Sequence, residues 1–141
     1  MTTQSEIKSL LDGRSEAIWT KDLERLMSFY AADVSYFDIV PPLRYDGADA
    51  LRERFRNWFD GFDGPIGQEL RELNVVAGGE IAVATMLIRA SGTLTNGREV
   101  GHWVRATSCC QRSNQLWLIT HEHVSLPADP ATGRVVVDLV P

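Results

Sequence analysis

Apolar residues recur at helical spacing in three segments near the N-terminus. The segments cover residues 3–19, 23–30 and 46–62, and within each the apolar positions lie three or four residues apart. The third segment also carries the largest aromatic stripe of the chain, with Phe55, Trp58, Phe59 and Phe62 on one face. The sequence therefore predicts three helices, and the aromatic face of the third either packs in the core or forms the wall of an apolar pocket.

The rest of the chain alternates apolar and polar residues, which is typical of half-buried strands. A short alternating run covers residues 34–38, before the third helix. Four longer runs, separated by short turn sequences, cover residues 68–77, 81–94, 98–112 and 116–126. They predict an antiparallel meander, with the helices gathered on one face of a curved sheet. We expect a single α+β domain over residues 1–141, in which residues 127–141 add an edge strand or a dimer arm.

The charge balance narrows the class of partner. Nineteen acidic residues exceed fourteen basic ones, and the net charge of -5 opposes binding to nucleic acid or anionic membranes. The N-terminus lacks the basic start and apolar run of a signal peptide, and no stretch approaches the roughly 18 apolar residues of a membrane span. Cys109 and Cys110 are adjacent and would point to opposite strand faces, so no disulfide is expected. We expect a cytoplasmic protein that binds neither nucleic acid nor membranes.

Nucleotide-binding and nucleophile motifs are missing from the sequence, because no glycine-rich loop joins a strand to a helix and no Gly-x-Ser-x-Gly pattern occurs. The chemical signal lies in polar residues at strand positions where apolar residues would be expected. These residues are Tyr36, Asp38, His102, Arg105, Thr107, His121, Glu122 and His123. They are the candidates for a functional site.

Tyr36 and Asp38 share one strand face, because side chains alternate along a strand. If helices cover that face, Asp38 is a carboxylate in an apolar pocket and a candidate general base; alternatively, it caps the loop that contains Pro41 and Pro42. His121 and His123 also share a face and, with a carboxylate nearby, could form a metal site in a metal-dependent enzyme. No third ligand is suitably spaced, so we expect no metal and no cofactor. Arg14 falls on an apolar helix face, where it either extends to solvent or meets a polar group inside.

The turn near Ser113 decides which strand residues meet. A three-residue loop over residues 113–115 would set Arg105 opposite His123 and Thr107 opposite His121, on one surface with Trp103 and Ile119. A two-residue loop would move the histidines to the other face. We favour the three-residue loop, because Asn114 or Gln115 can take the left-handed position that it requires.

The segments LMSFYAADVSYFD and WLITHEHVS, with the helix pair and the aromatic helix, resemble the SnoaL-like, ketosteroid-isomerase-like branch of the NTF2-like superfamily. The resemblance covers nearly the whole chain. It implies a cone in which a strongly bent antiparallel sheet wraps three N-terminal helices and leaves an apolar pocket, and it implies a homodimer through the outer sheet face.

The resemblance also implies functional roles. The catalytic Asp of the steroid isomerases matches Asp38, eight residues after Tyr30, while the positions of their two hydrogen-bond donors hold Arg14 and Ala106 or Thr107; that enzyme is itself a standard example of a tuned carboxyl pair. We expect an isomerase, lyase or cyclase in which Asp38 abstracts a proton and Arg105, His121 or His123 polarises a carbonyl. The expected ligand is small and apolar or bears a carboxylate. Residues expected to bind it are Arg14, Tyr36, Trp58, Phe62, Met86, Trp103 and Thr107.

WLITHEHVS is also similar to the pocket strand of the calcium/calmodulin-dependent kinase association domain, a relative that assembles without catalysis. The alternative function is therefore a ligand-binding or dimerisation module, in which Arg105 and the histidines hold a carboxylate and Asp38 is structural.

Overall fold

The computed structural model describes residues 2–141 and places its helices near the predicted segments. Helix α1 covers Thr3–Trp19, α2 covers Leu23–Met27 and α3 covers Ala48–Asp60. The Thr2 side chain caps α1 by accepting a hydrogen bond from the Ser5 N–H at 3.1 Å, and Asp22 caps α2 in the same way. Two strands precede α3, so the three helices are not consecutive elements.

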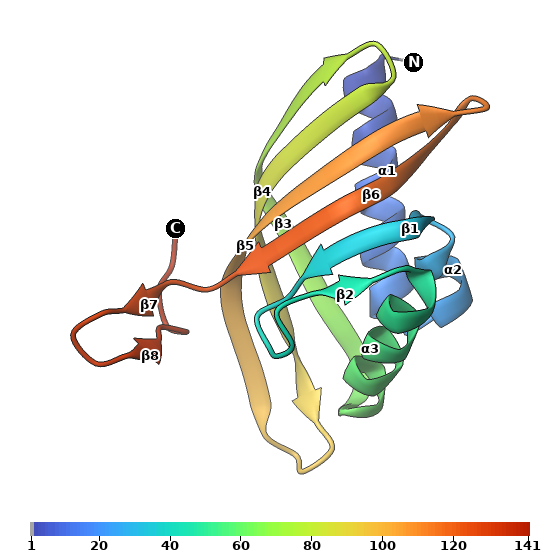
Figure 1. The fold of residues 1–141 in the computed structure, drawn as a ribbon. Coiled ribbons are helices and arrows are strands. Elements are labelled where there is room, and N and C mark those ends of the chain that lie inside the picture. Colours follow the sequence, from blue (N-terminus) through green and yellow to red (C-terminus); the bar gives the residue numbers. More distant parts are fainter. Residues whose placement is uncertain (1) are drawn as a thin grey trace.

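The strands form one six-stranded sheet in the order β2-β1-β6-β5-β4-β3. Their bounds are Tyr30–Phe37 for β1, Tyr45–Asp46 for β2, Phe62–Gly78 for β3, Ile81–Leu94 for β4, Glu99–Ser113 for β5 and Leu116–Ser125 for β6. Strands β3 to β6 form the antiparallel meander that the sequence predicts, and β1 adds to it in parallel with β6. Strand β3 begins earlier than predicted, directly after α3. The sheet is strongly curved, and the helices lie on its concave side (Figure 1).

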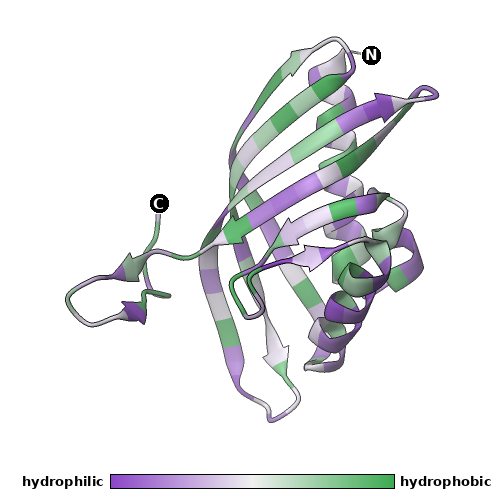
Figure 2. Cartoon of the chain, viewed as in Figure 1, coloured by the Kyte–Doolittle hydropathy of each residue, from purple (hydrophilic) through white to green (hydrophobic). Residues whose placement is uncertain are grey.

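Alternation along the strands produces the core (Figure 2). The even-numbered residues of β4 and β5, among them Ala84, Ile88 and Val104, are buried against the helices, while their neighbours face outward. The apolar stripe of α1 and the aromatic face of α3 cover this inner surface. Burying such apolar area contributes about 25 cal/mol per Å², which drives the helices onto the sheet.

The hairpin between β5 and β6 differs from the prediction in two places. Its loop has two residues, Asn114 and Gln115, both with positive φ, and Ser113 pairs with Leu116. The three-residue loop is therefore wrong. A bulge at Thr120 then shifts the register by one residue, so that Thr107 pairs with His123 and Arg105 with Ser125.

Because of these two changes, the histidines share a face with Arg105 as expected, while Ile119 does not. Ile119 is fully buried on the inner face.

The C-terminal residues do not extend the main sheet. Strands β7 (Ala128–Asp129) and β8 (Arg134–Val135) pair only with each other in a small hairpin beside the domain (Figure 1). The expected edge strand is therefore not formed. None of the helices in residues 2–141 has the length and apolar character needed to cross a membrane.

Candidate functional site

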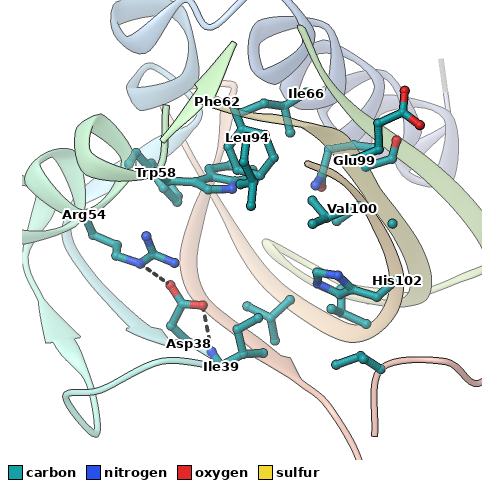
Figure 3. A pocket seen from close by; sticks show the side chains of 18 of the residues that line it. Asp38, Ile39, Arg54, Trp58, Phe62, Ile66, Leu94, Glu99, Val100 and His102 are labelled. Carbon is teal, nitrogen blue, oxygen red and sulfur yellow. Dashed lines mark hydrogen bonds and ion pairs between the residues drawn. The ribbon is translucent and has the colours of Figure 1, made fainter. Parts of the chain in front are cut away.

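A cavity of about 570 Å³ lies between α3 and the concave face of the sheet. Its apolar wall includes Trp58, Phe62, Ile66, Leu94 and Val100, which come from α3 and strands β3, β4 and β5 (Figure 3). The C-terminal segment reaches the same space through Val137. A concave, mainly apolar space of this size, with a few polar groups, is typical of small-molecule sites.

Asp38 follows β1 and lines this cavity, where its carboxylate is held at both oxygens. Arg54 Nε on α3 donates to Oδ2 at 2.7 Å, and the Ile39 N–H donates to Oδ1 at 2.7 Å (Figure 3). The Asp38 side chain is 8% exposed and that of Arg54 is 19% exposed. The strand alternation places Asp38 on the same face as Tyr36, as the sequence predicts.

A buried polar network is centred on Arg14, which lines the cavity. Arg14 Nη2 donates to Glu122 Oε1 at 2.9 Å, and its Nε donates to the Tyr30 hydroxyl at 2.9 Å. Tyr30 and Ser108 donate to the two oxygens of Glu122, each at 2.6 Å. Burial alone would lower the pKa of Arg14, but the Glu122 charge and the tyrosines outweigh it and raise that pKa. Arg14 therefore stays charged and meets a polar group inside, rather than extending to solvent.

The Tyr36 hydroxyl lies next to this network without a hydrogen-bond partner among residues 2–141. Burial raises the pKa of Tyr36 well above its ordinary value, and the negative charges of Glu122 and Asp38 raise it further. The hydroxyl thus keeps its proton at neutral pH. It is available to donate a hydrogen bond to a ligand in the cavity.

His102 on β5 lines the cavity on the wall across from Asp38 (Figure 3). It is partly buried, and burial lowers its pKa. The imidazole is therefore neutral near pH 7, where it can accept or donate a hydrogen bond.

Several of the predicted site residues are not brought together with Asp38. Trp103, Arg105, Thr107, His121 and His123 lie on the outer face of the sheet, separated from the cavity by the sheet itself. Met86 is buried in the core away from the cavity wall. The expected joint action of Arg105 or the histidines with Asp38 is therefore contradicted by the geometry.

The outer-face residues have contacts of their own. His121 Nδ1 lies 2.7 Å from Ser35 Oγ, and the Phe37 ring packs edge-on against both His121 and His123. Arg105 Nε donates to Ser125 Oγ at 3.1 Å, in a shallow hollow that Thr107 and His123 also line. In the part of the chain that the structure describes, no three His, Cys, Asp or Glu side chains are grouped to hold a metal ion.

Four of the residues predicted to bind the ligand line the cavity with Asp38, and the site also contains residues to which sequence analysis gave no role. Arg14, Tyr36, Trp58 and Phe62 are the predicted ones. Arg54, Gln68 and His102 also line it, and Glu122 lies behind Arg14. His102 was among the polar strand residues. Because side chains two positions apart share a strand face, its spacing from the apolar Val104 was the signal that could have placed it inside.

The comparisons with known proteins agree with this architecture. A family model described as a SnoaL-like domain matches residues 7–129. An NTF2-like protein of unknown function from Pseudomonas putida KT2440 is 30% identical and has a TM-score of 0.90, with 100% of this chain and 99% of that chain covered. Among proteins of curated function, none matches the chain.

Two further solved structures share the fold at lower identity. A candidate dehydratase of the NTF2-like family from Streptomyces avermitilis is 20% identical, with a TM-score of 0.77 and coverage of 86% of this chain and 94% of that one. A candidate calcium/calmodulin-dependent protein kinase II association domain from Xanthomonas campestris is 19% identical, with a TM-score of 0.79 and coverage of 92% and 90%. One is described as an enzyme and the other as an assembly domain.

Proposed function

Because this chain belongs to the SnoaL-like domain family of the NTF2-like superfamily, we propose that it is a small-molecule enzyme of the ketosteroid-isomerase-like type. In this proposal it acts as an isomerase, lyase or cyclase without a cofactor, and Asp38 is the general base. The supporting observation is one cavity that combines apolar walls with the Asp38 carboxylate and the donors Arg14 and Tyr36.

The proposed reaction starts from a ligand with an acidic C–H next to a carbonyl group. Asp38 takes the proton from carbon, and the C–H electron pair moves onto the carbonyl oxygen as an enolate. The Tyr36 hydroxyl donates to that oxygen. Arg14 supplies further donors. Tyr30, Gln68 and Glu122 use three of its five N–H groups, and the other two have no partner among residues 2–141. Where a C=C bond is conjugated with the enolate, return of the proton to the far carbon gives an isomer. Where the β-carbon bears a leaving group, re-formation of the carbonyl expels that group with its bonding pair, which is a lyase reaction.

Proton abstraction can be tested before the substrate is known. We would incubate the protein with 2-tetralone in deuterated buffer and follow loss of the α-proton signals by NMR. The wild-type protein should accelerate exchange over buffer, and Asp38→Asn should reduce the acceleration by about 100-fold or more. Circular dichroism would check that the variant is folded. Equal exchange by wild type and a folded Asp38→Asn variant would rule out Asp38 as the base.

One observation favours a second candidate function, a ligand-binding module without turnover. Both Asp38 oxygens already accept hydrogen bonds, from Arg54 and from the Ile39 N–H. Such bonds stabilise the carboxylate and are also what a structural Asp requires. Binding of 2-tetralone without any exchange would support this second function.

The proposal includes three points about the whole protein. The chain forms a single SnoaL-like domain over residues 1–141, acts as a homodimer, and is located in the cytoplasm, where the free thiols of Cys109 and Cys110 would stay reduced.

A further inference from the structure

Arg54 has more hydrogen-bonding capacity than its contact with Asp38 uses. Only Nε donates to Asp38, and the two terminal nitrogens, with four N–H groups, have no partner among residues 2–141. The side chain lines the cavity, and its terminal nitrogens point into the space in front of Asp38 (Figure 3). Unused donors in a partly desolvated site favour a ligand that supplies acceptors.

The shape of this group selects the kind of acceptor. The two terminal nitrogens of a guanidinium form a planar fork that matches the two oxygens of a carboxylate through parallel hydrogen bonds. Holding Asp38 through a single N–H does not need that fork. Since Asp38 occupies the Nε edge, an anion on the terminal nitrogens would lie closer to the Arg54 charge than to the Asp38 charge.

The charge of the cavity limits how many negative charges the ligand carries. The groups at the cavity and directly behind it are three cations, Arg14, Arg54 and Arg98, and three anions, Asp38, Glu99 and Glu122. They balance, and His102 is neutral near pH 7 because burial lowers its pKa. A single carboxylate can use the Arg54 fork in this setting, whereas a phosphate dianion would add a second negative charge between apolar walls.

We infer that Arg54 binds the carboxylate of the ligand, and that the ligands of this cavity are small monocarboxylic acids with an apolar ring or chain. This inference rests on the proposed function for the role of the cavity, and it names the substrate class. Trp58 and Phe62 contact the apolar part, and the carboxylate end lies beside Asp38.

A pair of probes of the same shape separates charge from size. We would titrate the full chain with 2-naphthoate and with 2-naphthamide by calorimetry at pH 7.5, where only the first is charged. The wild-type protein should bind the naphthoate at least about 10-fold more tightly than the amide. Arg54→Gln should remove this preference by weakening the binding of the naphthoate. Arg54→Lys should retain part of it, because it keeps the charge and loses the fork.

Arg56→Gln is the matched control, because Arg56 lies on the same helix, pairs with Glu53 and does not line this cavity. It should keep the full preference. A folded Arg54→Gln or Arg54→Lys protein that retains the wild-type preference would overturn the inference, as would a wild-type protein that binds neither probe. An Arg54-dependent preference without proton exchange on 2-tetralone would support the carboxylate site and favour the ligand-binding module, whereas exchange without the preference would support the proposed function and overturn this inference.

Discussion

Arg14 and Glu122 are 108 residues apart in the sequence, and their side chains meet at 2.9 Å beneath the cavity. The two side chains are 5% and 1% exposed. Removing such a pair from water costs several kcal/mol per ion, and the cost is offset only when the remaining polar atoms are also bonded. Tyr30 and Ser108 meet that condition for Glu122 by donating to its two oxygens. The pair therefore joins α1 to β6 at the base of the site.

We predict that Glu122→Gln lowers the free energy of unfolding by about 3–5 kcal/mol, because it leaves the buried Arg14 charge without a counter-charge. Chemical denaturation would measure the change. Asp12→Asn is the control, since Asp12 pairs with Lys8 on the exposed surface of α1 and such pairs contribute about 0.5 kcal/mol or less. Similar losses of unfolding free energy in the two variants would show that the buried Arg14–Glu122 pair stabilises the fold no more than an exposed pair does.

Tyr30 and Tyr36 lie beside this ion pair, and we expect Tyr36 to support proton exchange and Tyr30 to support stability. Tyr36→Phe removes a hydroxyl without a protein partner in residues 2–141, so stability should change little, while proton exchange on 2-tetralone should fall by about 100-fold. Tyr30→Phe removes bonds to Arg14 and Glu122 and should lower stability by about 1–3 kcal/mol. Denaturation and NMR exchange on both variants would check this. Unchanged exchange in Tyr36→Phe would remove Tyr36 from the proposed mechanism.

Strand and helix periodicity was sufficient to predict most of the elements. The predicted 81–94 run coincides with β4, because its apolar alternation has no interruption and Gly78, Gly79, Asn96 and Gly97 mark both ends. Two features were not predictable in this way. The start of β3 at Phe62 was hidden by Gly64 and Pro65, and the pairing of β1 with β6 joins segments that are distant in the sequence.

The composition of the site was harder to predict because of the bulge at Thr120. Continuing the alternation from Trp117 and Ile119 would place His121 and His123 inside. The bulge inserts one residue, so Glu122 and Val124 face inward instead and both histidines face outward. A bulge has no reliable sequence signature, and one residue reverses every later side chain. The bulge therefore explains why the histidines were assigned to the cavity side. Arg105 was misassigned for a different reason, because the predicted three-residue loop set it on one surface with Ile119, which is buried inside. Asp38, Tyr36 and Arg14 lie on other elements and do line the cavity.

The third prediction concerns the oligomeric state of the protein. Val76, Ile81 and Leu116, at the ends of β3, β4 and β6, are each more than half exposed. We expect a homodimer that covers part of the outer sheet face, as the resemblance implies. Light scattering at micromolar concentration should give twice the mass of the 15.7 kDa chain. A mass equal to one chain at that concentration would contradict the prediction.

The two cysteines should differ in reactivity. Burial raises the pKa of Cys110 to about 12, so it has almost no thiolate at pH 8. Cys109 is half-buried on the other strand face. Iodoacetamide at pH 8 should therefore modify Cys109 and leave Cys110 intact, which peptide mass spectrometry would measure. Cys109→Ser should remove labelling of the folded protein, and unfolding in urea should restore it at Cys110. Preferential labelling of Cys110 without urea would contradict its burial.

His102 should make stability depend on pH in a defined direction. Burial lowers the pKa of His102 below 6.5, so between the folded and unfolded pKa values the unfolded chain binds more protons. The contribution of the neutral imidazole is therefore complete above pH 6.5 and is lost as the pH falls through the folded pKa. When the pH falls from about 7.5 to about 5, the wild type should lose stability relative to His102→Gln. Denaturation at both values would measure it, and NMR would identify the His102 titration as the signal missing from His102→Gln. A measured His102 pKa above 6.5 would show that a nearby negative charge outweighs burial. It would contradict a neutral His102 in the cavity.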